Sequence, residues 1–92
     1  MESSNDEDTS VPVVFRVSRD DATDVYALFP TLDEGRGMVR TFAHIGGHGN
    51  ADYAGCLATS RPAKPEEYAA LKRELEAYPY RYRLDVRKRR PA

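Results

Sequence analysis

The chain has 92 residues, of which 32% are charged and 40% are hydrophobic, with one cysteine and a formal net charge of -1. That length accommodates one hydrophobic core, and the apolar fraction exceeds that of a wholly disordered chain. No apolar run approaches the ~18 residues that span a bilayer, the N-terminus lacks the apolar region of a secretory signal, and one cysteine cannot form an intrachain disulfide framework. These features favour a small cytoplasmic protein that does not contact a membrane.

The charge is distributed unevenly along the chain. Residues 1–9 carry a formal charge of -4, residues 10–79 carry -2 and residues 80–92 carry +5. An acidic segment without apolar periodicity is typical of a disordered tail, and a basic end is typical of a solubilising strand end or of a surface for acidic partners. We therefore predict an acidic tail at 1–10, one domain at 11–88 and a basic tail at 89–92.

Two apolar segments near the N-terminus predict a β-hairpin. Residues 11–18 alternate between an apolar face and a mixed face that carries Arg16. A polar cluster at 20–24 is typical of a turn, and residues 25–29 form a second apolar run that ends at Pro30. The loop of this hairpin should contain five or six residues.

The middle of the chain has weaker patterns. Residues 31–37 have the composition of a loop, and residues 38–45 predict a strand with two mixed faces, either both covered or one partly open. The glycines of residues 46–50 break regular structure. Residues 53–60 are compatible with a return strand or with a short helical turn, and Gly55 weakens both alternatives. We expect an irregular extended return there.

The region from residue 65 to residue 87 predicts a helix followed by a strand. The helix begins at Pro65, which suits the first helical position, and Pro79 ends it. Its apolar side chains recur on one face, at Tyr68, Leu71, Leu75 and Tyr78. Residues 80–87 then alternate between apolar and mostly basic side chains, which indicates a strand with one solvated face.

Together these elements predict an α+β domain of two layers. We expect a mainly antiparallel sheet of four strands, or five, with one amphipathic helix on one face, in the order β-β-β-(β)-α-β. Because one helix covers only one face, the other face should be polar or should meet a partner. The side chains expected on this open face are those of Arg16, Arg81, Arg83 and Arg87, with Arg40 beside them.

Residues 44–56 concentrate reactive side chains, namely both histidines, an aspartate and the cysteine. His44, His48 and either Asp52 or Cys56 are weak candidates for a metal site, because imidazole, carboxylate and thiolate all bind Zn²⁺. A Cys56 nucleophile with a histidine base and phosphate binding by the glycine-rich backbone are alternatives, but the spacing matches no established motif. The simplest interpretation is a polar turn, and we assign no catalytic residue, no metal and no cofactor.

A combined pattern across residues 25–87 resembles a group of small uncharacterised bacterial proteins that also occur among mobile-element and phage-type genes. The pattern comprises ALFP at 27–30, HxGxH at 44–48, ADY at 51–53, RPAxPEEYxxLxxEL at 61–75 and YxLxV at 82–86. The resemblance implies a bacterial, cytoplasmic protein of one small domain. It implies no activity, substrate or cofactor.

We therefore expect a non-enzymatic binding module with a macromolecular partner, in the first place a protein. The candidate binding residues are His44, His48, Asp52 and Tyr53 in the loop and Arg81, Arg83 and Arg87 on the open face. One alternative is a nucleic-acid-binding module that uses the arginine-rich face, and another is a metal-dependent or hydrolytic enzyme centred on His44 and His48. Self-association through the exposed face or edge of the sheet is a further expectation.

Overall fold

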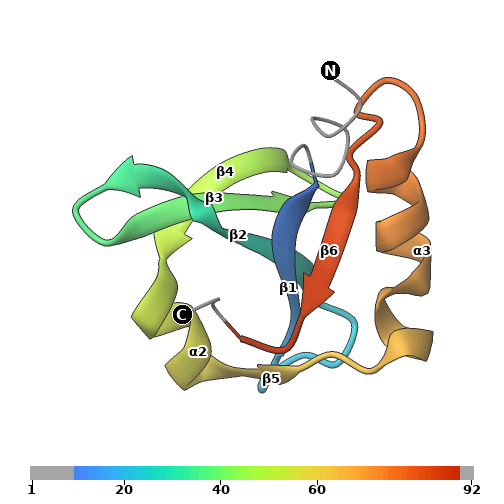
Figure 1. The fold of residues 1–92 in the computed structure, drawn as a ribbon. Helices are drawn as coiled ribbons and strands as arrows, with labels where there is room; N and C mark the ends of the chain where they lie inside the picture. The colour runs from blue at the N-terminus through green and yellow to red at the C-terminus, as the bar shows by residue number, and fades with distance from the viewer. Residues whose placement is uncertain (1–9, 90–92) are drawn as a thin grey trace.

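A computed structural model describes residues 10–89, so the predicted tails lie almost wholly outside the described part of the chain. These residues form a six-stranded sheet and two helices (Figure 1). The elements are β1 Val11–Ser18, β2 Val25–Gly35, β3 Met38–Ala43, β4 Gly47–Asp52, α2 Tyr53–Thr59, β5 Ser60–Pro62, α3 Pro65–Glu76 and β6 Leu84–Arg87. Neither helix of the described residues is long and apolar enough to cross a membrane.

β1 is the central strand of the sheet. It pairs with β2 in an antiparallel hairpin, and the sheet continues through β3 to β4 at one edge. On its other side β1 pairs with two short strands, antiparallel with β5 near its end and parallel with β6 near its start. The predicted α+β class, the mainly antiparallel sheet and the six-residue loop between β1 and β2 are thus confirmed.

Both faces of the sheet are covered, which corrects the prediction of an open face. Val13 and Phe15 of β1 pack toward α3, in a core that includes Leu71 and Leu75 of that helix. Val14, which points the opposite way, packs with Leu28, Val39 and Tyr53 under α2. Figure 1 shows the two helices on different sides of the sheet. The prediction failed because it contained only one helix.

α3 begins at Pro65 as predicted but ends at Glu76, two residues before the end of the predicted apolar stripe at Tyr78. Glu67 accepts a hydrogen bond from the Lys64 backbone N–H at 2.8 Å, which satisfies one of the unpaired donors at the helix start. Tyr68 stacks on Phe15 with ring centroids 4.4 Å apart. Tyr78 is 80% exposed, so its predicted place in the apolar stripe is wrong.

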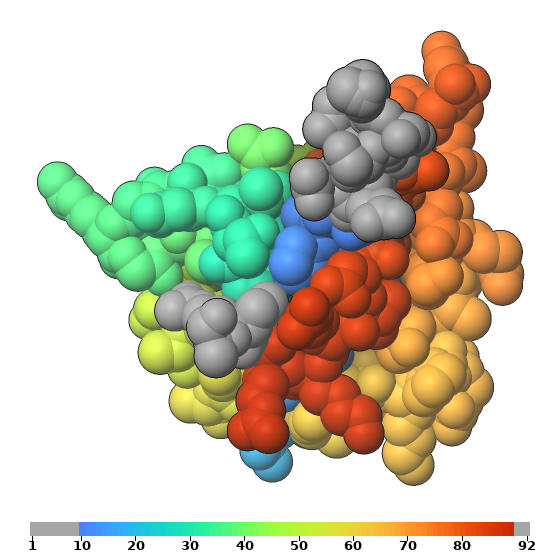
Figure 2. All heavy atoms as spheres, in the orientation of Figure 1, coloured from blue at the N-terminus to red at the C-terminus, as the bar shows by residue number. Residues whose placement is uncertain are grey.

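β2 continues through Pro30 to Gly35, although a loop was predicted at residues 31–37. Phe29 pairs with Arg40, but the next pair joins Asp33 to Val39, so residues 30–32 form a bulge. Proline lacks the N–H that a regular ladder requires, and a bulge is where a strand can accommodate it. The extended β2–β3 hairpin projects at the left of the molecule in Figure 2.

β4 and α2 occupy the part of the chain where the sequence predicted a break and an irregular return. Residues of β4 pair with β3 from Ala43↔Gly47 to Met38↔Asp52, so β3 imposes the extended conformation on a glycine-rich segment. α2 follows immediately, and it is too short to be stable without packing. Its signal was the spacing of Tyr53, Cys56 and Leu57, which places three side chains on one helical face toward the sheet.

The final strand is shorter than predicted, because β6 begins only at Leu84. Arg81 has a positive φ of 55°, which interrupts the extended conformation that residues 80–87 were expected to share. The backbone N–H of Arg81 donates to Ala77 O at 2.8 Å, and that of Tyr82 donates to Leu75 O at 2.9 Å. These bonds hold the chain against the end of α3 before it turns into β6.

Candidate functional site

The two histidines are engaged by different partners. His44 lies in the turn between β3 and β4, and its Nδ1 is 2.8 Å from Glu74 Oε1 on α3. His48 lies on β4, and its Nε2 is 2.9 Å from the hydroxyl of Tyr82. Among the described residues no group of three histidine, cysteine or acidic side chains could hold a metal ion. The structure therefore does not bring His44, His48 and Asp52 together as a shared site.

The other candidates of that segment belong to α2 or to its junction with β4. Tyr53 is buried in the core between α2 and the sheet, where it serves packing. Cys56 is half-buried at the same core. Its thiol therefore lies on the face of the sheet opposite α3, away from the His44–Glu74 pair. A cysteine nucleophile activated by His44 is inconsistent with this placement.

The predicted arginine stripe does not form, because its members have separate environments. Arg16 is buried, and its guanidinium donates to Ser60 Oγ at 2.8 Å and to Ser60 O at 2.9 Å. Burial also lowers the pKa of Arg16. Arg87 is paired with Asp85 at 2.9 Å, and Arg81 lies over the Tyr78 ring at 5.5 Å. Arg83 forms the connection to β6 and accepts from Val11 N–H through its carbonyl.

His48 belongs to an aromatic cluster on the α3 face of the sheet. Its ring centroid lies 4.9 Å from that of Phe42, 5.4 Å from that of Tyr80 and 5.9 Å from that of Tyr82. Partial burial, and secondarily the positive charge of Arg40, lower the pKa of His48 below its usual range. The hydrogen bond between the neutral His48 imidazole and the Tyr82 hydroxyl holds the connection between α3 and β6 against the sheet.

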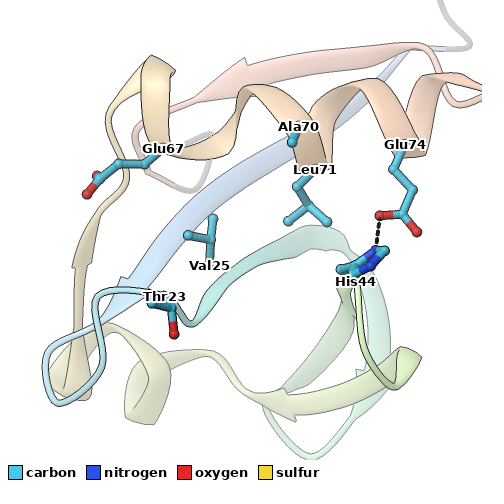
Figure 3. A pocket seen from close by; sticks show the side chains of 7 residues that line it. All are labelled: Thr23, Val25, His44, Glu67, Ala70, Leu71 and Glu74. Carbon is cyan, nitrogen blue, oxygen red and sulfur yellow. Dashed lines mark hydrogen bonds and ion pairs between the residues drawn. The ribbon is translucent and has the colours of Figure 1, made fainter.

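A groove beside His44 combines a cavity with a predicted site residue. We call it the His44 groove, and it comprises a cavity of about 380 Å³ between α3 and the start of β2. Figure 3 shows Val25, Ala70 and Leu71 between the polar side chains of Thr23, His44, Glu67 and Glu74. A second cavity of about 310 Å³ shares Thr23, Val25 and His44, and it extends the groove toward Ile45.

The polar side chains of the groove are fixed by ion pairs and hydrogen bonds. Glu67 forms a two-pronged ion pair with Arg61, at 2.9 Å and 2.7 Å, and this pairing lowers the pKa of Glu67 to about 2. The Thr23 hydroxyl donates to Asp21 at 2.7 Å, and the pKa of Asp21 is lowered mainly by that bond. Glu74 is held by His44 at the other end of the groove. These contacts fix the positions of the rim side chains.

The lining of the His44 groove is apolar at its floor and acidic at its rim. Its carboxylates are those of Asp21, Asp24, Glu67 and Glu74, and no lysine or arginine among residues 10–89 contributes to the lining. Ile45 projects beside it and is 87% exposed. Such a surface attracts cations and can bury an apolar side chain, whereas it repels phosphate groups.

Sequence reasoning identified His44 but missed the other half of the groove. Glu67 and Glu74 are seven residues apart, with Leu71 between them, so a helix places all three on one side. This spacing was a usable signal. The contact between α3 and the β3–β4 turn was not predictable, because it depends on where the sheet places that turn.

In comparisons with known proteins, no family model, no curated protein and no solved structure matches this chain. The function therefore has to be inferred from the geometry of the groove and its surroundings.

Proposed function

We propose that this protein is a non-enzymatic module that binds an extended, basic segment of a partner protein in the His44 groove. An apolar side chain of the segment would insert between Val25 and Leu71, and neighbouring lysine or arginine side chains would face the acidic rim. The observation that carries this proposal is an apolar floor with four carboxylates at its rim, one of them (Glu67) paired with Arg61, and no lysine or arginine among the described lining residues.

The arrangement of the groove supports binding in preference to catalysis. The hydroxyl of Thr23 already donates to Asp21, and the thiol of Cys56 lies on the other face of the sheet. The His44–Glu74 pair thus lacks an adjacent nucleophile among the described residues. Fixed carboxylates, by contrast, lose little conformational entropy when a basic side chain binds to them.

Charge also favours a protein segment over nucleic acid. The rim would repel a phosphate backbone, while the basic side chains considered for nucleic acid are dispersed or buried. A basic polypeptide gains both charge-assisted hydrogen bonds and apolar burial in the same groove.

The proposal is tested by fluorescence anisotropy with a labelled, capped Gly-Lys-Leu-Arg-Gly peptide and a matched Gly-Glu-Leu-Glu-Gly peptide. We expect only the basic peptide to bind, with affinity that falls as salt rises. Glu74→Gln should weaken binding about 10- to 150-fold, because one charge-assisted hydrogen bond contributes about 1.5–3 kcal/mol. Ala70→Trp should abolish binding by filling the groove.

The matched control is Glu76→Gln, which removes a carboxylate from the same helix at a position paired with Lys72 outside the groove. It should bind the basic peptide as the unaltered protein does. Equal binding of both peptides, or an equal loss in Glu74→Gln and Glu76→Gln, would refute the placement of the site. Urea unfolding of each variant establishes that the comparison is between folded proteins.

A further inference from the structure

The outer edge of β4 is an unpaired sheet edge in the described part of the chain. Within residues 10–89, β4 is the end strand and pairs only with β3. Its six residues include no proline, lysine or arginine, which are the usual means of blocking an edge. The opposite edge is protected, because β5 and β6 are short and carry Pro62, Arg61 and Arg87.

One hydrogen bond shows which backbone groups of β4 point outward. The N–H of Tyr53 donates to Gly37 O at 3.3 Å, in line with the β3–β4 register. Hydrogen-bonded and non-hydrogen-bonded pairs alternate along an antiparallel ladder. The N–H and C=O groups of Gly49 and Ala51 therefore face β3, and those of His48, Asn50 and Asp52 face the open edge.

We propose that β4 pairs antiparallel with β4 of a second copy of this chain, with Asn50 on the two-fold axis. His48 of each copy then lies opposite Asp52 of the other, and Asn50 lies opposite Asn50. All three outward-facing residues of each strand form hydrogen-bonded pairs in this register. A shift by one step leaves only two such pairs, because the third residue falls opposite Gly46 in the turn or Ala54 in α2.

The side chains are complementary in the same register. His48, Asn50 and Asp52 share one face of β4, so each imidazole lies across from a carboxylate and the two amides lie across from each other. Asp52 is exposed and makes no side-chain cap hydrogen bond to α2. The opposite face carries only Gly47, Gly49 and Ala51, which offer little steric obstruction.

The dimer would have one continuous sheet with both α3 helices on the same face. The edge at β5 and β6 is protected, so it does not pair with β4 of another copy. Only the two β4 edges pair, and the association therefore closes at two copies instead of growing into a filament. Strand pairing alone buries less surface than a standard permanent interface, so we expect an equilibrium between monomer and dimer.

The first experiment is sedimentation equilibrium over a range of protein concentrations. The unaltered chain should show a concentration-dependent dimer. Asn50→Pro should remain monomeric, because it removes a donor that faces the edge and spares the β3–β4 bonds. His48→Asp and Asp52→Lys should each weaken the dimer, whereas the double variant should restore it by placing opposite charges across the interface.

A second experiment reports the register without a destabilising substitution. Asn50→Cys in a Cys56→Ser background should be linked to a second copy by a short bismaleimide, while Thr31→Cys on the exposed part of β2 should not. A chain that is monomeric at every concentration, or a dimer that persists unchanged in folded Asn50→Pro, would overturn the proposal. Linking of Thr31→Cys as efficiently as Asn50→Cys would overturn the register.

Discussion

Arg16 was expected on a solvated surface, but the structure buries it. Its alternation placed it on a solvated face, yet α2 and β5 cover that face and bury it. The guanidinium donates to Ser60 and, at 3.4 Å, to the carbonyl of Leu57, and no buried side-chain donor of the described residues lacks a partner. Arg16 therefore ties β1 to the end of α2 and does not form part of a surface.

We predict that Ser60→Ala destabilises the protein through Arg16. The substitution removes the acceptor of the Arg16 Nε–H and leaves that donor buried, which costs about 1–3 kcal/mol of unfolding free energy. Urea denaturation monitored by circular dichroism measures the change. Thr59→Ala, which removes an exposed neighbouring hydroxyl, is the control, and an equal loss in both variants would contradict this role for Ser60.

Glu67 makes the stability of the protein depend on pH. Its pKa is about 2 in the folded protein, because Arg61 and the Lys64 N–H stabilise the carboxylate, and it is about 4.3 in an unfolded chain. The unfolded state therefore takes up the proton first as pH falls. The stabilisation is present at neutral pH and declines between about pH 4.5 and pH 2.

Glu67→Gln tests this dependence directly. The variant should have a lower urea midpoint than the unaltered protein at pH 7, and the difference should shrink as the pH approaches 2. Glu76→Gln, whose carboxylate pairs with Lys72 on the surface, serves as the comparison. A difference between Glu67→Gln and the unaltered protein that stays constant over this range would exclude the Arg61–Glu67 contribution.

α2 covers the face of the sheet that was expected to be open, and it packs there mainly through one buried side chain. Tyr53 supplies much of its buried contact. Tyr53→Ala should lower the free energy of unfolding by about 3–5 kcal/mol, as for other buried aromatic side chains. Tyr78→Ala should change it by less than about 0.5 kcal/mol, because Tyr78 is 80% exposed.

Chemical denaturation of the two tyrosine variants distinguishes packing from surface binding. A fully stable Tyr53→Ala protein would restore Tyr53 as a surface binding candidate. A large loss of unfolding free energy would show that Tyr53 acts in packing and not in surface binding.

The elements differ in how much of them could be predicted. β1 and α3 carry their own signals, since alternation or a helical stripe with Pro65 at the start specifies each locally. β4 carries almost none, because Gly47 and Gly49 become a strand only through pairing with β3. The candidate site was predictable only in part. His44 was a candidate from the sequence, whereas Glu74 belongs to the site only because the fold brings it into contact with His44.

At the scale of the whole molecule, the sheet is complete only when the C-terminal segment returns to β1. β6 pairs with β1 from Val11↔Leu84 to Val14↔Arg87, and Leu84 packs against the core under α3. A chain that ends at Arg83 should therefore lose its cooperative thermal transition, whereas a chain that ends at Arg89 should keep it. Differential scanning calorimetry measures both, and a sharp transition in the shorter chain would show that β6 is dispensable.

The parallel pairing of β1 with β6 also determines how the protein responds to a pulling force. These are the first and last strands of the described chain, and they lie side by side in the same direction (Figure 1). A force applied at Ser10 and Arg89 therefore acts along the two strands and loads their hydrogen bonds together, in shear. Because all these bonds must yield at once, the barrier to forced unfolding should be high for so small a domain, and a partner that pulls on both ends would meet a mechanically resistant link.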